Sequence, residues 1–503
     1  MFNRLKNRWL LGLLFLALAA VPQGGMVPAA NPTSSEAARL LAGRELGQTP
    51  LLGDLEELCD RVGGRPTGSK ACDRAVDWAV AKFRAAGMDS VHTESFTAPD
   101  LWLGGEAEAE CLTPVRFPIR LAAAPGTAST PGGRAIEAPL VDVREGSAED
   151  FAWLGEKARG AIALVHSAEM KTEADLFGEY LRNRPLVAAA RKAGVAALLL
   201  QSTRPRGLLY RHPLTFDGAI EPVPAAIVSR EAAGRLARLA DQGEVRVRLA
   251  LANHIGGAYE ARNVVAEIRG REKPDEIVLI GAHLDSWDLG TGAEDNGVNS
   301  ALVIDVARGI QALGLSPRRT IRFVLFTGEE QGMQGSAAYV RQHAGELDRH
   351  VAMLTFDTGS GRTQGFYLNG REELRKPVRE ALAAVAGLQA TDDSPEGIDG
   401  TDNFDFLLSG VPNLVARQDW SPYLPNYHAE SDVYDQVNER EAKANAAIAS
   451  VLLWGLAEMP ERPAPRQTRA EVEKLLKKTG LDEQMKAFGQ WDAWVAGKRG
   501  VSR

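Results

Sequence analysis

Two histidines and five acidic residues stand where they could act together on a metal ion. Each follows a segment that predicts a buried strand, or lies in a neighbouring loop. His283 and Asp285 follow 276–280, Asp295 lies in the glycine-rich loop 290–297, Glu329 and Glu330 follow 320–326, Asp357 follows 351–356, and His428 lies in the loop 426–432. In an open α/β sheet the carboxyl ends of the strands face one crevice. We therefore expect these side chains to converge.

This set of side chains fits zinc chemistry. Imidazole and carboxylate groups are ligands that zinc takes in catalytic sites, and a pair of ions about 3.5–4 Å apart also needs a bridging carboxylate. The expected ligands of two Zn²⁺ per chain are His283, Asp295, Glu330, Asp357 and His428. Glu329 could take a proton from water and pass it to a leaving amine. Asp285 could orient His283 by accepting a hydrogen bond from its second ring nitrogen.

Taken singly, each of these residues has an ordinary explanation. Asp295 could be only a helix N-cap, the adjacent Glu329 and Glu330 could be surface charge, and a lone histidine after a strand is most often structural. The sequence contains only eight histidines, and two of them lie in loops at the same predicted sheet edge. Their coincidence with the strand-end acids favours a common site.

The elements that must position these residues alternate between strand and helix. Apolar runs predict strands over 263–268, 276–280, 320–326, 351–356 and 413–416, with helices over 300–313 and 404–409. This order predicts an α/β fold with a doubly wound, mostly parallel mixed sheet. Upstream, helical spacing over 35–87 is interrupted by the turn-forming residues 63–69, and 90–96 alternates like an edge strand.

Changes in composition and in the pattern of apolar residues predict domain boundaries. Between residues 101 and 255, short apolar runs at 161–165 and 196–200 flank a helical stretch at 186–193, which predicts a separate inserted domain. The main domain is then discontinuous, formed by residues 35–100 and 256–460. Residues 461–503 begin Pro-rich and become charged and helical, with Trp491 and Trp494. We expect them to form a docked helical appendage.

The first 30 residues predict a signal peptide. Arg4, Lys6 and Arg8 precede the apolar run 9–21, which is too short to span about 30 Å of hydrocarbon as a helix. A secreted or periplasmic protein without stable membrane insertion after cleavage is expected, with an uncleaved anchor as the alternative. The net charge of −8 gives no indication of a nucleic-acid partner, which would need a basic face.

The cysteines leave two alternatives open. There are three, Cys59, Cys72 and Cys111, so at least one is unpaired within a single chain. Cys59 and Cys72 could form a disulfide in an exported protein, or all three could be small buried thiols.

Five segments around the candidate ligands resemble the co-catalytic zinc aminopeptidase and glutamate carboxypeptidase family. They are Ala282-His283-Leu284-Asp285-Ser286, Gly292-Ala293-Glu294-Asp295-Asn296-Gly297, Gly328-Glu329-Glu330-Gln331-Gly332, the strand end at Asp357, and Tyr427-His428-Ala429-Glu430-Ser431-Asp432. The likeness extends over about residues 40 to 460. Within the family, residues 283–288 and 64–70 are most similar to the plasma glutamate carboxypeptidase branch of dipeptidases.

The resemblance implies a zinc-exopeptidase fold with a protease-associated-like domain at 101–255. It implies that His283 and Asp357 bind one zinc, that Glu330 and His428 bind the second, and that Asp295 bridges them. Glu329 would be the general base, and the peptide bond Asp295–Asn296 would be cis. Where relatives carry small residues after the bridging Asp, this chain has Val298 and Asn299.

The expected function is that of a di-zinc exopeptidase acting on dipeptides or on the N-terminal residue of short peptides. The alternatives are a catalytically inactive, receptor-like binding protein, or a mono-zinc acyltransferase resembling glutaminyl cyclase. Tyr427 could stabilise an oxyanion or simply pack as an aromatic, and Asp402 is a further candidate near the substrate. Side-chain preference and a possible homodimer remain open.

Overall fold

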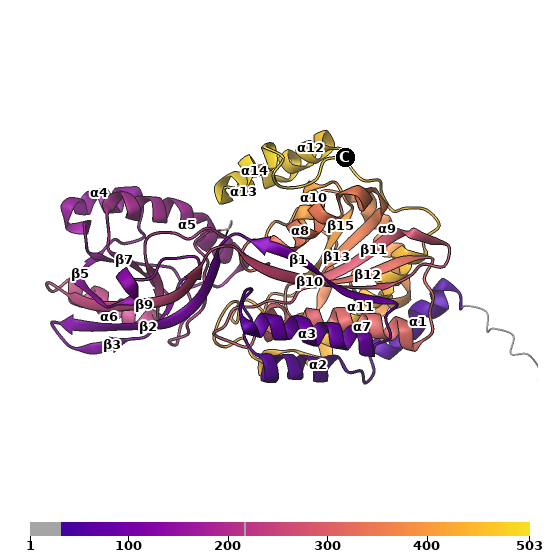
Figure 1. Ribbon diagram of the computed structural model, residues 1–503, viewed down its shortest axis with the longest axis horizontal. Coiled ribbons are helices and arrows are strands. Elements are labelled where there is room, and N and C mark those ends of the chain that lie inside the picture. The colour runs from indigo at the N-terminus through magenta and orange to yellow at the C-terminus, as the bar shows by residue number, and fades with distance from the viewer. Residues whose placement is uncertain (1–31, 216–217) are drawn as a thin grey trace, which may run out of the picture.

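The computed structural model describes residues 32–215 and 218–503, which build two sheets that lie side by side (Figure 1). The predicted signal peptide at 1–30 lies outside the described residues. Within the two described ranges, none of the helices combines the length and apolar character that crossing a membrane requires.

The first sheet is mixed and has seven strands. In spatial order they are β1 (Ser90–Ala98), β10 (Tyr259–Ile268), β12 (Arg319–Phe326), β11 (Lys273–His283), β13 (His350–Thr355), β15 (Asn413–Gln418) and β14 (Thr363–Tyr367). The four strands from β12 to β15 are parallel, and the remaining pairs are antiparallel. The prediction of a mixed α/β sheet is confirmed. Its parallel part is confined to the centre, and β14 had not been expected.

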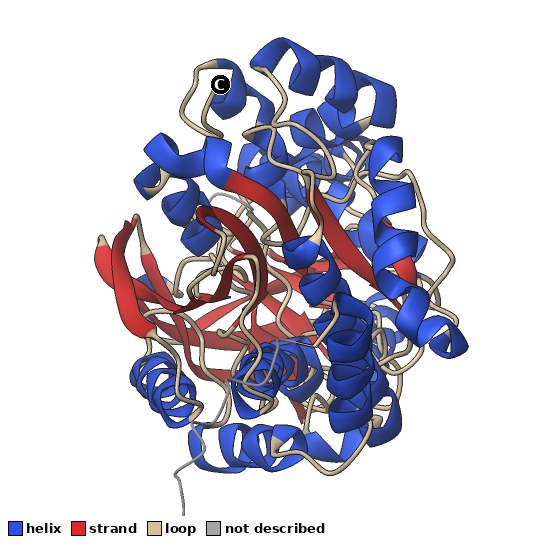
Figure 2. Ribbon diagram, turned by 90° about the vertical axis from the view of Figure 1, so that its right-hand side faces the viewer, coloured by secondary structure: helices blue, strands red, loops and turns tan. Residues whose placement is uncertain are grey.

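Helices cover both faces of this sheet (Figure 2). Alternate residues of a strand point to opposite faces, so Val278 and Ile280 of β11 pack on one side and Leu279 on the other. The first face is covered by α1 (Ser34–Glu45), α2 (Leu51–Glu57), α3 (Lys70–Ala85), α7 (Val298–Ala312), α9 (Arg375–Ala381) and α11 (Glu439–Glu458). The second face is covered by α8 (Gln334–Gln342) and α10 (Phe404–Leu408).

The second sheet has eight strands and occupies the segment predicted to be inserted. Their order is β3 (Phe117–Ile119), β2 (Leu101–Thr113), β9 (Arg246–Gly256), β5 (Ile136–Asp142), β6 (Ile162–Val165), β7 (Ala197–Gln201), β8 (Ala225–Val228) and β4 (Leu121–Ala123). Strands β2 and β9 form a long antiparallel pair that continues into β1 and β10 of the first sheet. The second sheet is thus attached through two adjacent strands (Figure 1).

Three helices pack on the second sheet: α4 (Ala148–Leu154), α5 (Glu173–Ala193) and α6 (Arg230–Ala240). The helix predicted over 186–193 is much longer, since α5 begins at Glu173 behind a capping box formed by Thr172 and Asp175. Pro185 lies inside it. Proline normally interrupts a helix, which explains why the first half of α5 escaped prediction.

The C-terminal residues form three helices, as expected: α12 (Arg469–Thr479), α13 (Leu481–Phe488) and α14 (Trp491–Val495). Buried Trp494 packs with Leu475 and Leu476 of α12 against Phe404 and Leu407 of α10. Arg499 donates to both carboxylate oxygens of Asp405, at 3.1 and 2.9 Å. The appendage is therefore docked by an apolar contact and a bidentate ion pair.

The three cysteines are free and buried. Of the two alternatives, the structure agrees with buried thiols and contains no Cys59–Cys72 disulfide.

Replacing Trp494 should loosen the appendage. Truncation of a fully buried tryptophan typically costs about 3–5 kcal/mol, so Trp494→Ala should lower the free energy of opening of α12–α14 by that order. Hydrogen exchange of their amides measures it. Val495→Ala is the matched control because Val495 is 56% exposed. Equal exchange rates in the two variants would contradict this packing.

Candidate metal centre

The five expected ligands converge at the carboxyl ends of the parallel strands. His283 ends β11, Glu330 follows β12, and Asp357 follows β13, while Asp295 lies just before α7 and His428 lies in the loop between β15 and α11. His283 Nε2 lies 3.1 Å from Asp295 Oδ1 and 2.9 Å from Asp357 Oδ1. His428 Nε2 lies 3.3 Å from Asp295 Oδ2 and 2.8 Å from Glu330 Oε2.

The two oxygens of Asp295 thus face two different histidines. Asp295 Oδ1 lies in one cluster of polar atoms with His283 and Asp357. Asp295 Oδ2 lies in a second cluster with His428 and Glu330. Each cluster holds one imidazole nitrogen and carboxylate oxygens within a few ångströms, which is the composition that a zinc ion takes. One carboxylate stands between two potential ion positions.

Unpaired oxygen atoms indicate what this centre accommodates. Asp295 Oδ2, Glu330 Oε1 and Asp357 Oδ1 are buried and accept no well-aligned hydrogen bond within the described chain, although the first and last lie close to histidine nitrogens. Buried polar atoms are normally paired, because an unpaired one loses its hydration without compensation. Single ligand atoms of His283, Asp295 and Glu330 also lie within 4.8 Å of one another. A cation would satisfy all of these atoms, so the residues fit a metal site.

The close packing of buried acids and histidines shifts the pKa values of the ligands. Burial raises the pKa of Glu330 to about 7, with the Asp295 carboxylate adding to the rise and His428 opposing it. Burial disfavours the charged form of His428, yet Glu330 and Asp295 outweigh it and raise the pKa of that histidine to about 9. Protons and metal cations would compete for these groups.

His283 is oriented by Asp285, but not through the atom that was expected. Its Nδ1 lies 2.9 Å from the main-chain carbonyl oxygen of Asp285 and 3.7 Å from the carboxylate oxygen Oδ1. The carboxylate instead accepts a hydrogen bond from Thr67 Oγ1 at 2.9 Å and one from the main-chain N–H of Glu329 at 3.4 Å. The Asp285 side chain therefore ties the Glu329 loop to Thr67, and its backbone holds the histidine.

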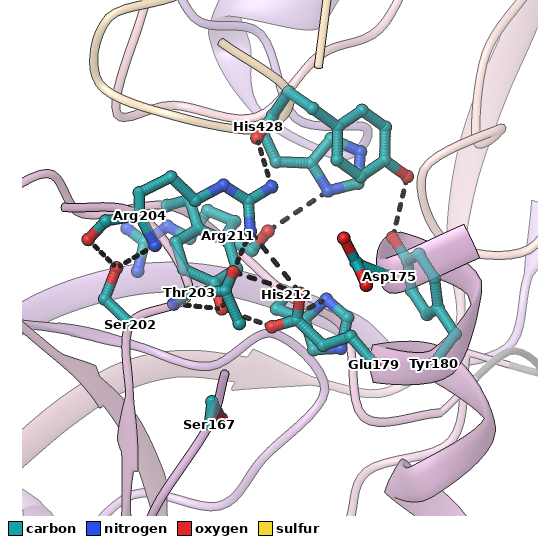
Figure 3. Close-up of polar contacts among 12 residues, drawn as sticks. Ser167, Asp175, Glu179, Tyr180, Ser202, Thr203, Arg204, Arg211, His212 and His428 are labelled. Carbon is teal, nitrogen blue, oxygen red and sulfur yellow. Dashed lines mark hydrogen bonds and ion pairs between the residues drawn. The ribbon is translucent and has the colours of Figure 1, made fainter. Parts of the chain in front are cut away.

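His428 is oriented from the second sheet's side of the molecule. Its Nδ1 lies 3.1 Å from the main-chain oxygen of Arg211, and the main-chain N–H of Arg211 donates to the His428 main-chain oxygen at 2.9 Å (Figure 3). A carbonyl bonded to the second ring nitrogen fixes the tautomer and plane of a metal-binding histidine. Nothing in the sequence around Arg211 marks it, because the backbone performs this role.

Tyr427 is packed beside the same ligand. Its ring stacks on that of His428 with centroids 3.7 Å apart, and its hydroxyl is 2.7 Å from that of Tyr180 in α5. The packed-aromatic alternative describes this arrangement. Asp402 is fully buried. Its neighbour Thr401 lines the cavity beside the ligands, but Asp402 does not.

A buried arginine holds the loops that carry the ligands. The Arg65 guanidinium donates to the carbonyl oxygens of Leu284, Thr291 (2.7 Å) and Gly292 (2.9 Å). The Asp432 carboxylate accepts from the main-chain N–H of Glu294 at 2.6 Å and of Asp295 at 3.1 Å. Arg65 of the motif at 64–70 thus contacts the ligand loops directly, although more than two hundred residues separate them in the chain. The peptide bond Asp295–Asn296 is cis, as the resemblance implied.

A cavity opens beside the ligands, with an empty volume of about 1040 Å³ that includes its solvent-filled mouth. Its wall includes Glu329 and the ligands His283, Asp295, Glu330, Asp357 and His428. It also includes residues that sequence reasoning missed, from α5 (Glu173, Leu176, Phe177 and Tyr180), from the loop after β15 (Trp420 and Tyr423) and from α13 (Phe488). These residues had no recognisable motif, and only the fold brings them to the centre.

Comparison with known proteins identifies the family. The profile of peptidase family M28 matches residues 263–453. The crystal structure of a peptidase M28 precursor from Shewanella amazonensis SB2B is 30% identical, covers 86% of this chain and 99% of its own, and superposes with a TM-score of 0.78. The chain belongs to peptidase family M28. The resemblance inferred from the motifs is confirmed, and the protein is a metallo-exopeptidase.

Other relatives agree with this assignment. Carboxypeptidase Q from Mus musculus and from Homo sapiens are each 28% identical over 407 residues, which is 80% of this chain and 85% and 84% of theirs. A zinc aminopeptidase from Bacillus subtilis shares the fold, with a TM-score of 0.65 at 20% identity over 83% of this chain and 96% of its own.

Arg65→Lys should weaken metal binding. One ammonium cannot reach all three ligand-loop carbonyl groups that the guanidinium fork contacts, so the ligand loops should loosen. Loss of such supporting contacts typically costs 10–100-fold in metal affinity, which zinc titration against a competing chelator would measure. Arg61→Lys, at an exposed position just upstream, is the control. Unchanged zinc affinity in the Arg65 variant would refute this role.

Proposed function

We propose that this protein is a secreted or periplasmic di-zinc exopeptidase that hydrolyses dipeptides or removes the N-terminal residue of short peptides. The observation that carries the proposal is the position of Asp295, whose two oxygens face His283 and His428 at 3.1 and 3.3 Å. A carboxylate between two ligand groups is the arrangement that a pair of catalytic metal ions requires.

The five side chains would divide between two zinc ions. His283 and Asp357 would hold one ion, His428 and Glu330 would hold the other, and Asp295 would bridge them. When bound, zinc would polarise the scissile carbonyl and make a water molecule more acidic. The zinc aminopeptidase from Bacillus subtilis, which shares the fold, supports the choice of metal.

Glu329 is the proposed proton carrier. It is half-buried, lines the cavity next to Glu330, and its loop is held through its N–H by Asp285. Burial raises the pKa of Glu329 well above its usual range; His283 opposes the rise and Asp357 adds to it. A carboxylate of raised pKa can accept a proton from the attacking water and return it to the leaving amine.

The cavity supports a small substrate. Its wall combines the charged ligands with large aromatic and apolar side chains such as Trp420 and Phe488, which is usual for small-molecule sites. Carboxypeptidase Q and the Bacillus aminopeptidase are both named as exopeptidases, which supports a terminal bond as the target. We propose the same division of the chain as expected from sequence: a peptidase domain of residues 35–100 and 256–460, an inserted domain at 101–255, and an appendage at 461–503.

Export is proposed from residues 1–30 alone, whose basic start and short apolar run are typical of a signal peptide. Amino-terminal sequencing of the protein recovered from the producing cells tests it.

Glu329→Gln should abolish turnover and leave zinc in place. The amide keeps the shape of the side chain but cannot accept a proton, and loss of a general base typically costs 10²–10⁴-fold in rate. Hydrolysis of dipeptides and amino-acid amides, together with zinc analysis of the same sample, measures both properties. Glu56→Gln, at an exposed position on α2, is the control. Full activity of the Glu329 variant would exclude this residue as the base.

Zinc stoichiometry tests the division of the ligands. The purified protein should hold two zinc ions per chain, Asp357→Ala and His428→Ala should each retain one, and Asp295→Ala should lose both. Elemental analysis after dialysis gives these values. One ion per chain in the unmodified protein would favour the mono-zinc acyltransferase, and none would favour a binding protein.

A further inference from the structure

Three segments that are far apart in the chain meet at one wall of the cavity. Leu176 and Tyr180 of α5, Leu424 of the loop after β15 and Phe488 of α13 form one apolar cluster. Of these, Leu176, Tyr180 and Phe488 also line the cavity that contains the metal ligands. The family match ends at residue 453, so Phe488 comes from a part of the chain beyond it.

Phe488 is held in place from two sides. The guanidinium of Arg184, on α5, donates to the carbonyl oxygens of Lys486 at 3.4 Å and Ala487 at 3.5 Å, at the end of α13. Gly489 follows with a φ of +77°, and a Cβ there would lie 2.4 Å from Arg184 Nη1. On the other side, Met485 of the same helix is fully buried in the cluster that docks the appendage. The ring of Phe488 therefore has a defined position, with 8% of the residue exposed.

The wall around Phe488 presents apolar surface to the cavity. The hydroxyls of Tyr180 and Tyr427 lie 2.7 Å apart at the edge of the wall, so one of them donates to the other. Tyrosine rings whose hydroxyls are engaged in this way act as apolar surface. Trp420 and Phe177 continue the same lining. Such a surface binds a large apolar side chain by removing it from water.

We infer that Phe488 is a specificity-determining residue, which with Leu176 and Tyr180 forms the pocket for a large apolar side chain of the substrate. The inference rests on the proposed function and adds a substrate class to it: dipeptides or short peptides that carry a leucyl-sized or aromatic residue at the scissile bond. The C-terminal appendage is then part of the active site.

Substrate selectivity tests this assignment. Phe488→Ala should lower kcat/KM about tenfold, mainly through KM, for whichever of Phe-Ala and Ala-Phe places its aromatic ring in the pocket. The reason is that one wall of the pocket is removed. Hydrolysis of Ala-Ala should stay within about twofold. Phe488→Leu should restore most of the loss. Trp491→Ala is the matched control, since Trp491 is a partly buried aromatic of the same appendage that packs on its docking cluster and does not line the cavity.

A binding measurement separates this inference from the proposed mechanism. In a Glu329→Gln background, calorimetry with the zinc-loaded protein gives the Kd of the same dipeptides. Adding Phe488→Ala should weaken binding of the aromatic dipeptide about tenfold and leave the Kd of Ala-Ala unchanged. The role of Phe488 would be overturned if the variant lost affinity and kcat/KM equally for all dipeptides. It would also be overturned if the ratio of the aromatic dipeptide to Ala-Ala stayed unchanged in both assays. Turnover that survives Glu329→Gln would overturn the base and leave the selectivity ratios valid. A protein that cleaves and binds none of the dipeptides would overturn both.

Discussion

The shared carboxylate of Asp295 is the constraint on which the rest of the centre depends. Its two oxygens lie within 3.3 Å of the imidazole nitrogens of His283 and His428, which are far apart in the chain. A single side chain can serve both only if the loop before α7, the end of β11 and the loop before α11 are all held to within fractions of an ångström. Many of the surrounding contacts hold these three segments in place.

Buried ionisable groups require such support. A charged group removed from water is tolerated only when it is paired and hydrogen-bonded. Arg65 provides fixed positive charge and three carbonyl contacts on one side, and Asp432 receives two backbone N–H groups on the other. Thr67 and Asp285 link the first histidine to the Glu329 loop. The ligand loops are thus held where a few buried side chains meet backbone groups, so substitution of one of these side chains should disturb the centre.

The ligands were predictable because their positions follow from a rule of the fold. Strand ends in a parallel sheet meet at one edge, and the strands themselves were evident from apolar runs such as 320–326, now β12 (Arg319–Phe326). The orienting groups were less predictable, because a carbonyl looks the same at every residue. Asp285 was expected to act through its carboxylate but acts on His283 through its backbone, and Arg211 could not be inferred at all. The length of α5 was missed because Pro185 lies within it, and the cavity role of Phe488 because an apolar residue in a helix carries no signature of its contacts.

The attachment of His428 to Arg211 has a consequence for how the molecule is made. The chain must place the second sheet against the loop at 426–432 before this imidazole has its partner, and α13 leaves the ribosome after all five ligands. A nascent chain that ends before residue 488 would have all five ligands in its sequence but an incomplete cavity wall. The wall of the cavity is therefore complete only after α13 has packed against α5.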